Sequence, residues 1–312
     1  MQIFMIVTSQ KGVIDMRAGF IGAGKVGFSL GKYLKENGVE ITGYFSKSPE
    51  SAKSAADFTN TKLYKSIENI LSDSDTLFIT VPDGQIGEIW DDMRNLPIKN
   101  KNICHCSGSI SSTVFFDGEN LGANIYSVHP LYAISDKCES WKHLNKAYFT
   151  VEGSAENLDE IKSIFERAGN KVIAMGAENK SLYHCGAVVV SNLVNGLFQV
   201  GAEMLVKCGF DKKDAKKALV PLFTGNADTL AEKGVAAALT GPVERNDLST
   251  ITKHIEAIEA AWINESEEKV GYEMIYLLLS EKLLSIAQEK HLDSDYLKMT
   301  EVIKNEKHSI HF

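Results

Sequence analysis

The chain has 312 residues, of which 44% are hydrophobic and 24% charged, and its formal net charge is −8. This length exceeds one typical core and predicts two domains. The acidic balance argues against a nucleic-acid partner, and no uninterrupted apolar run reaches the roughly 20 residues that would span a bilayer, so no membrane partner is expected.

The first fifteen residues precede the first expected strand. Their apolar stretch, Ile3 to Val7, lacks both the basic flank and the small-residue cleavage site of a signal peptide. We expect residues 1–15 to be an extension that the fold does not need, with the folded part beginning near Met16.

A glycine-rich segment, Gly22-Ala23-Gly24-Lys25-Val26-Gly27, follows an apolar run and precedes a helix-like segment, Phe28 to Asn37. In a strand–turn–helix context, a G-x-G-x-x-G pattern predicts a dinucleotide site rather than an ordinary turn. Its first glycine permits the tight bend, the second lets the backbone approach a pyrophosphate, and the third lets the helix pack on the strand. The phosphates then bind at the helix N-terminus, so the expected cofactor residues are Gly22, Gly24, Lys25, Val26 and Gly27.

The second predicted strand, Val39 to Phe45, ends in Ser46-Lys47-Ser48. A cofactor with a free ribose 2′-hydroxyl favours a carboxylate at this position, and none is present. Hydroxyls and a cation suit a 2′-phosphate, so the segment favours NADP over NAD. A plain surface turn, with Ser48 as helix N-cap and Pro49 after it, is compatible with the same residues.

Strands and helices continue to alternate up to residue 176, which predicts a doubly wound, mostly parallel Rossmann-type sheet. Asp83 is expected to cap the helix that follows Pro82. The expected strands are residues 62–64, 76–81, 102–106, 124–128, 147–151 and 171–174, and the expected helices are residues 49–56, 66–71, 85–93 and 156–168.

No convincing strand appears after Gly176, so residues 177–312 are expected to form an all-helical domain, following an NADP-binding domain over residues 1–176. The longest expected helix, Lys180 to Cys208, is largely apolar. The other expected helices cover residues 212–219, 228–233, 248–263, 265–289 and 293–306.

Ligands of open α/β sheets lie beyond the carboxyl ends of the strands, where Val81-Pro82, Ser107 and His129 are expected. Ser107 and Ser109 surround Gly108 and are suited to hold a carbonyl, a carboxylate or the nicotinamide amide, although a simple turn would contain the same residues. His129 precedes Pro130 and is a candidate proton donor to a carbonyl or imine, against a purely structural histidine.

Two further polar groups occur in the helical half. Asn192 lies on the same helical face as His184 within an otherwise apolar segment, so these side chains either line a cavity or bond a neighbouring helix. Arg245 follows the Gly241-Pro242 turn and is suited to an anionic substrate group, or to a surface ion pair.

The five cysteines are scattered, form no C-x-x-C motif and predict reduced thiols in a cytoplasmic protein. Cys104-His105-Cys106 is not expected to bind zinc, because alternate residues of a strand face opposite sides and no second cluster supplies further ligands.

These motifs together resemble the Rossmann-like family whose C-terminal part is domain of unknown function 2520. That family is related to pyrroline-5-carboxylate reductase, 6-phosphogluconate dehydrogenase and the deazaflavin-dependent NADP reductases. One departure is Asn246, where the family often has glycine between arginine and aspartate. The matching segments are GAGKVG at 22–27, VPDGQI at 81–86, HCSGSIS at 105–111, SVHPL at 127–131, YHCGAVVVSN at 183–192 and LTGPVERND at 239–247.

The resemblance implies an NADP(H)-dependent oxidoreductase that transfers a hydride between nicotinamide and a small carbonyl, imine or hydroxy-acid substrate. It favours His129, His184 and Arg245 as cleft residues, with Ser107 and Asn192 orienting the reacting group, and it implies a homodimer through the helical domain. An NADP-binding sensor or scaffold without turnover is the alternative. A flavin or deazaflavin hydride partner is a third possibility.

Overall fold

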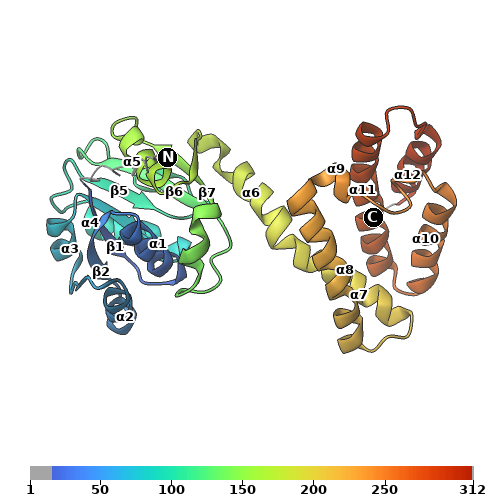
Figure 1. Cartoon of the computed structure of the whole chain (residues 1–312), viewed down its shortest axis with the longest axis horizontal. Helices are drawn as coiled ribbons and strands as arrows, with labels where there is room; N and C mark the ends of the chain where they lie inside the picture. Colours follow the sequence, from blue (N-terminus) through green and yellow to red (C-terminus); the bar gives the residue numbers. More distant parts are fainter. Residues whose placement is uncertain (1–15, 311–312) are drawn as a thin grey trace, which may run out of the picture. The chain divides into compact units, whose positions relative to one another are not determined.

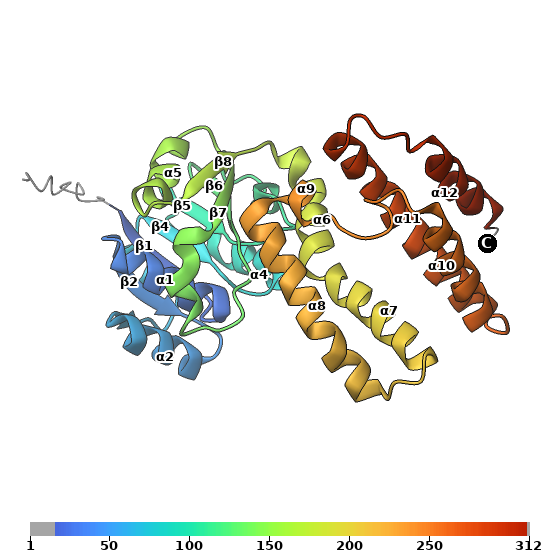
Figure 2. The ribbon, with the colours of Figure 1, turned by 45° about the vertical axis from the view of Figure 1, so that its right-hand side comes forward.

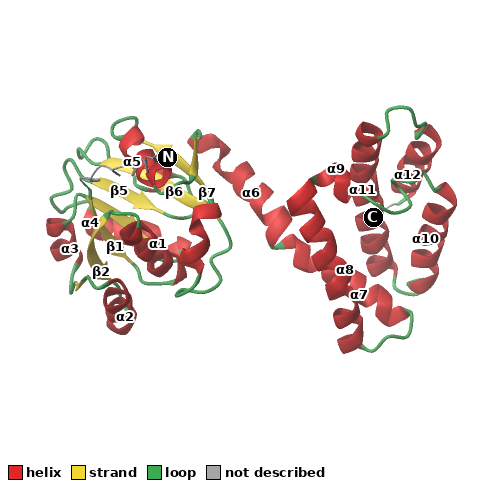
Figure 3. Cartoon of the chain, viewed as in Figure 1, coloured by secondary structure: helices red, strands yellow, loops and turns green. Residues whose placement is uncertain are grey.

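The computed structural model describes residues 16–310, and the expected N-terminal extension lies outside this part of the chain. Two compact units follow each other in sequence, with the division between Ser191 and Asn192. All strands of the described residues belong to the first unit, and the second contains helices alone (Figure 3). The predicted α/β part followed by an all-α part is therefore confirmed.

The first unit is built on one eight-stranded sheet of order β3-β2-β1-β4-β5-β6-β7-β8 (Figures 1 and 2). Every neighbouring pair is parallel except β6 with β7. Because β1 lies between β2 and β4, the chain reverses direction across the sheet at β1, which is where such sheets bind ligands. The strands are β1 (Arg17–Ile21), β2 (Glu40–Phe45), β3 (Lys62–Leu63), β4 (Thr76–Ile79), β5 (Asn102–His105), β6 (Asn124–Leu131), β7 (Tyr148–Gly153) and β8 (Lys171–Ala174).

Helices cover both faces of this sheet, and each face has its own apolar core. One core packs α1, α2 and α5 around Phe20 and Phe78, while the other packs α3 and α4 around Leu77 and Ile79. Strand β4 is thus buried on both faces, as its continuous apolar sequence predicts. The helices are α1 (Lys25–Glu36), α2 (Pro49–Thr59), α3 (Ile67–Asp73), α4 (Asp83–Met93), α5 (Leu158–Arg167) and α6 (Lys180–Ser191).

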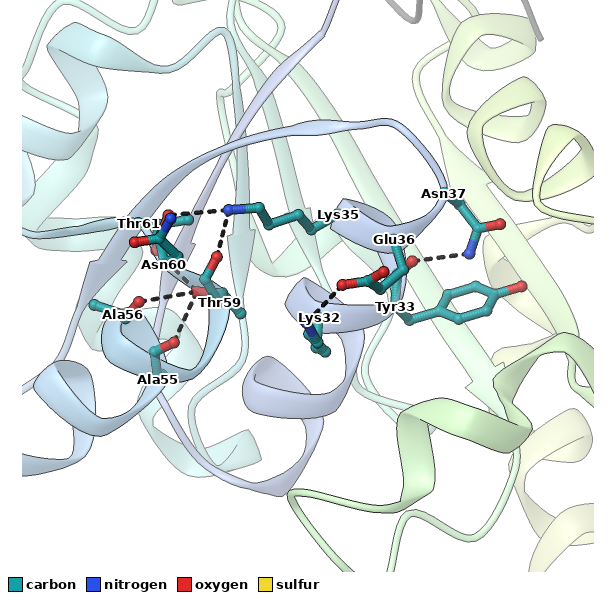
Figure 4. A network of polar contacts seen from close by, with 10 residues as sticks. All are labelled: Lys32, Tyr33, Lys35, Glu36, Asn37, Ala55, Ala56, Thr59, Asn60 and Thr61. Atoms are coloured by element: carbon teal, nitrogen blue, oxygen red, sulfur yellow. Dashed lines mark hydrogen bonds and ion pairs between the residues drawn. The ribbon is translucent and has the colours of Figure 1, made fainter.

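One lysine side chain joins the C-terminal ends of α1 and α2. The Lys35 ammonium donates to the carbonyls of Thr59 and Asn60, at 2.9 Å in the second case (Figure 4). These carbonyls belong to the last turn of α2, where no intrahelical donor is left for them. The contact therefore joins the C-terminal ends of the two helices that precede and follow β2 in the chain.

Several predicted boundaries in the first unit differ from the structure by two or three residues, and two differences bear on the candidate site. Strand β6 does not end at Val128 but continues to Leu131, because β7 pairs with it antiparallel and opposes His129 with Thr150. Asp83 is not a cap but the first residue of α4, whose N-cap is Pro82. Its carboxylate is thereby available for contacts outside the helix.

The second unit has a separate core, formed by α9–α12 residues such as Ile251, Leu277 and Met299. The expected helix over residues 180–208 is interrupted at Asn192, and the two helices expected within 212–233 are one helix, which runs through Pro221. A proline inside a helix removes one backbone bond without always ending the helix. The helices are α7 (Leu193–Lys207), α8 (Lys212–Lys233), α9 (Val235–Ala238), α10 (Leu248–Ala261), α11 (Ser266–Lys290) and α12 (Leu297–Ser309).

One helical stretch, residues 177–207, is long and apolar enough by length and composition to cross a membrane, and only 6% of its most apolar window is buried. The stretch includes α6 and α7, and its exposed side chains include Leu182, Val190 and Leu193. An exposed apolar face of this kind on a folded protein also marks a surface that another protein covers.

Candidate functional site

The glycine-rich turn has the close contacts that its sequence predicts. Gly22 has φ +105°, and a Cβ there would lie 2.8 Å from the Thr80 carbonyl. At Gly27, a Cβ would lie 2.3 Å from Thr80 Oγ1 and 2.5 Å from the Gly22 oxygen, so α1 packs directly on the ends of β1 and β4. At Gly24, by contrast, a Cβ would meet nothing within 4 Å. The turn is therefore tight on its inner side and open to a ligand at Gly24.

Helix α1 begins at this open side. Its N-cap is Gly24, no side chain caps it, and its first turn contains no acidic residue. Backbone N–H groups at an uncapped helix N-terminus suit a phosphate, so these residues fit the pyrophosphate of a dinucleotide. The Val26 side chain is half-buried and packs against the core beneath α1. A hollow of about 120 Å³ adjoins the turn and is lined by Ile21–Gly24, Phe45–Lys47, Thr80–Pro82, Gln85 and Ile89.

The Ser46-Lys47-Ser48 segment lines one side of this hollow. Ser48 is the N-cap of α2 and accepts a bond from the Ser51 amide, as predicted. Lys47 Nζ lies 3.2 Å from Glu88 Oε2 of α4, and Ser48 Oγ donates to Glu50 Oε2 at 3.2 Å. The segment itself contains no carboxylate, but Glu50 follows it in the sequence and Glu88 approaches it from α4, which the local sequence does not reveal.

A second polar group is centred on Asp83. Its Oδ2 accepts bonds from Ser107 Oγ at 2.9 Å and from Ser109 Oγ at 2.8 Å. Ser107 Oγ in turn accepts from the amides of Ser109 and Ile110, so it organises the loop after β5. The predicted Ser107 site is thus joined to the residue after Pro82, and both lie beyond neighbouring strands of the sheet.

His129 is oriented by Tyr183 of α6. Its Nδ1 lies 2.7 Å from the Tyr183 hydroxyl, and the rings meet edge to face. A Cβ built on Gly108 would lie 2.9 Å from His129 Nε2 and 2.8 Å from His184 Nδ1. The two predicted histidines therefore converge on Gly108, where only glycine fits without a shift of either ring. His184 Nδ1 is buried and has no hydrogen-bond partner among residues 16–310.

Lys180 supplies a buried cation that the sequence did not indicate. The residue is 1% exposed, and its Nζ donates to Ser127 Oγ at 2.5 Å. Glu152 of β7 is also buried and accepts from both the amide and the hydroxyl of Ser112, each at 2.7 Å. A lysine at the start of an apolar helix is ordinarily exposed, so no local pattern distinguishes Lys180.

Burial and the positive charge of Lys180 determine the protonation of His129 and of His105. Burial, followed by the Lys180 charge, lowers the pKa of His129 to about 4, and burial lowers the pKa of His105 to about 4. Burial lowers the pKa of Lys180, while Glu152 opposes that change. His129 and His105 are therefore neutral near pH 7, and the Glu152 carboxylate favours the charged form of Lys180.

The remaining two predicted residues belong to the second unit. Asn192 is the N-cap of α7, and its carbonyl accepts from the Asn195 amide at 3.1 Å. Arg245 lies in the turn before α10, where its amide donates to the Gly241 carbonyl. Asn246 has φ +55°, a conformation that asparagine tolerates better than most residues, so the turn accommodates it. Within the described residues, no group of three His, Cys, Asp or Glu could hold a metal ion.

Two protein families match successive parts of the chain. Residues 17–103 match the family described as "NADP oxidoreductase coenzyme F420-dependent", and residues 147–282 match the domain of unknown function DUF2520. A search of the curated proteins gave no match.

Three solved structures have a similar fold. Protein TM1727 from Thermotoga maritima is 25% identical, with a TM-score of 0.69 over 88% of this chain and 99% of that protein. A proposed NADP oxidoreductase from Bacteroides fragilis, BF3122, is 21% identical, with a TM-score of 0.63 over 87% of this chain and 99% of its own. A reductive aminase from Aspergillus terreus, in complex with NADPH and ethyl-5-oxohexanoate, has the same fold at 13% identity, with a TM-score of 0.57 over 93% of each chain. The chain therefore carries, in this order, a segment similar to the NADP-oxidoreductase family and a segment similar to DUF2520, and it has a Rossmann-like fold.

Proposed function

We propose that the protein is an NADP(H)-dependent oxidoreductase that reduces a small carbonyl or imine, or oxidises the corresponding alcohol or amine. The observation that carries this proposal is the convergence of His129, Tyr183 and Lys180 beside the loop after β5 that contains Ser107 and Gly108. The family match and the nucleotide turn support the cofactor, since one sheet edge presents both groups of residues.

The cofactor phosphates would be held by the turn from Gly22 to Gly27 and by Lys25, with Ser46 and Lys47 near the adenosine ribose and Val81-Pro82 toward the nicotinamide. When bound, NADPH supplies the hydride. We assign proton exchange with the substrate to His129 Nε2, because Tyr183 fixes the opposite ring nitrogen. The Lys180 ammonium would stabilise negative charge that develops on the reacting oxygen or nitrogen. Arg245 and Asn192 remain proposed substrate residues.

The test is NADPH oxidation against keto acids, aldehydes, cyclic imines and a deazaflavin, the last because the matching family's description names coenzyme F420. We expect turnover with one class, and a loss of about 10²- to 10⁴-fold in His129→Ala. His143→Ala, which removes a histidine from the segment η2 (Ser140–Lys146), is the control and should retain activity. Tight NADPH binding without turnover on the whole panel, unchanged in His129→Ala and His184→Ala, would instead support the sensor.

We further propose that the protein is a homodimer joined through its helical part. An apolar hollow of about 550 Å³ in the second unit is lined by Leu197, Phe198, Leu222 and Phe223, among others. Leu222 is 71% exposed on α8, whereas Leu292, after α11, is 86% exposed outside this hollow. Sedimentation should give twice the 34.3 kDa chain mass for the protein and for Leu292→Glu, but one chain mass for Leu222→Glu. A monomeric parent protein would contradict the proposal.

A further inference from the structure

We propose that Glu88 sets the preference between NADPH and NADH by competing with the cofactor's 2′-phosphate for Lys47. This inference rests on the proposed function, since it concerns the same nucleotide site. It arises from a contact between two elements that lie 41 residues apart in the chain, the loop after β2 and helix α4.

The Lys47–Glu88 pair lies beside the hollow that adjoins the glycine-rich turn. Ser46 and Lys47 line one side of the hollow beside the glycine-rich turn, and Gln85 and Ile89 of α4 line the other. Glu88 lies between these two residues in the sequence of α4, and its Oε2 lies 3.2 Å from Lys47 Nζ. The ion pair therefore joins the two sides of the hollow in which the adenosine end of the cofactor would lie.

The Lys47–Glu88 ion pair is weak enough for a bound phosphate to displace Glu88. The two side chains are 62% and 63% exposed, and ion pairs at such exposure contribute only about 0–1 kcal/mol. A phosphate carries nearly two negative charges and three acceptor oxygens, so it can take Lys47 from Glu88. The displaced carboxylate then repels the phosphate, which leaves NADPH bound less tightly than Lys47 alone would allow. NADH lacks this phosphate and does not compete for Lys47.

The other charges around this segment do not replace Lys47. Glu50 accepts a bond from Ser48 Oγ and adds a second carboxylate nearby. Lys25 follows Gly24 at the N-terminus of α1, where it belongs to the pyrophosphate end of the turn. Among the residues that line the hollow, Lys47 is the cation that a 2′-phosphate would meet.

The test is direct binding of NADPH and of NADH, followed by cofactor fluorescence, to the full-length protein and its variants. Glu88→Gln should tighten NADPH binding about 3- to 5-fold and change NADH binding by less than about 2-fold. In Lys47→Gln the further change of Glu88→Gln should tighten NADPH binding clearly less than it does in the parent protein, because the contested cation is absent and only the repulsion by the carboxylate is relieved. Glu139→Gln is the matched control, since Glu139 is also 63% exposed and pairs with Lys142.

Three outcomes would decide against the proposal, in distinguishable ways. If both cofactors bind and Glu88→Gln changes neither, Glu88 has no influence on the site, although the proposed function stands. If Glu88→Gln selectively weakens NADH, Glu88 binds a ribose hydroxyl and favours NAD, the opposite of the proposal. If neither cofactor binds to the parent protein, the proposed function itself fails.

Discussion

Replacing Lys180 by methionine is expected to lower kcat about 10²- to 10³-fold with the substrate class identified by the panel. The physical reason is that Lys180 provides a buried positive charge beside His129, where the medium screens charge poorly. Methionine has nearly the same length and fills the space, so the change removes charge and the bond to Ser127 rather than volume. Stopped-flow or steady-state NADPH oxidation measures the effect.

Two further measurements separate this role from a structural one. The Lys180 charge contributes to the lowered pKa of His129, so in Lys180→Met that pKa should rise toward its usual value of 6.5, as followed by NMR. Activity that depends on the ammonium should fall as pH rises through the lowered lysine pKa, and Lys180→Met should lack this alkaline limb. An unchanged His129 titration and pH profile would contradict the assignment. Lys53→Met, at an exposed ion pair, is the control.

Replacing Gly27 by alanine is expected to lower the free energy of unfolding by about 3 kcal/mol. The added Cβ would lie 2.5 Å from the backbone oxygen of Gly22, which cannot move aside without opening the turn between β1 and α1. Urea unfolding followed by circular dichroism measures the change, with the midpoint shifting and the slope unchanged for a purely native-state effect.

Gly24→Ala is the matched control for this prediction, because a Cβ at Gly24 meets no atom within 4 Å. This variant should keep nearly the parent's unfolding free energy yet bind NADPH more weakly, since the methyl group occupies the open side of the turn. Equal destabilisation by the two substitutions would mean that the close packing at Gly27 is not what holds the turn.

Several local features of the structure were predicted from sequence because they follow from local pattern. The glycine-rich turn has a positive φ at Gly22 and close backbone contacts at Gly22 and Gly27, as its spacing predicts. Ser48 caps α2, and Ser107 lies directly beyond β5, because caps and buried strands have short-range signatures. The strand–helix alternation likewise sufficed for the fold class.

Other features depended on partners that are distant in the chain. His129 lies within β6 and not beyond it, because the pairing partner β7 extends the strand, and no local signal marks an antiparallel neighbour. Asp83 was expected to cap α4 but instead binds two serines from the loop after β5. A capping residue and a residue that binds a distant loop have the same local sequence.

The sequence by itself determined the fold class, the nucleotide turn and the identity of most polar residues at the strand ends, since each depends on periodicity or on glycine at fixed spacing. Only the tertiary structure revealed that Lys180 is buried against Ser127, and that Glu88 lies against Lys47. Charged side chains carry no local signature of burial or of partner. Their electrostatic roles are decided by which elements the packed sheet brings together.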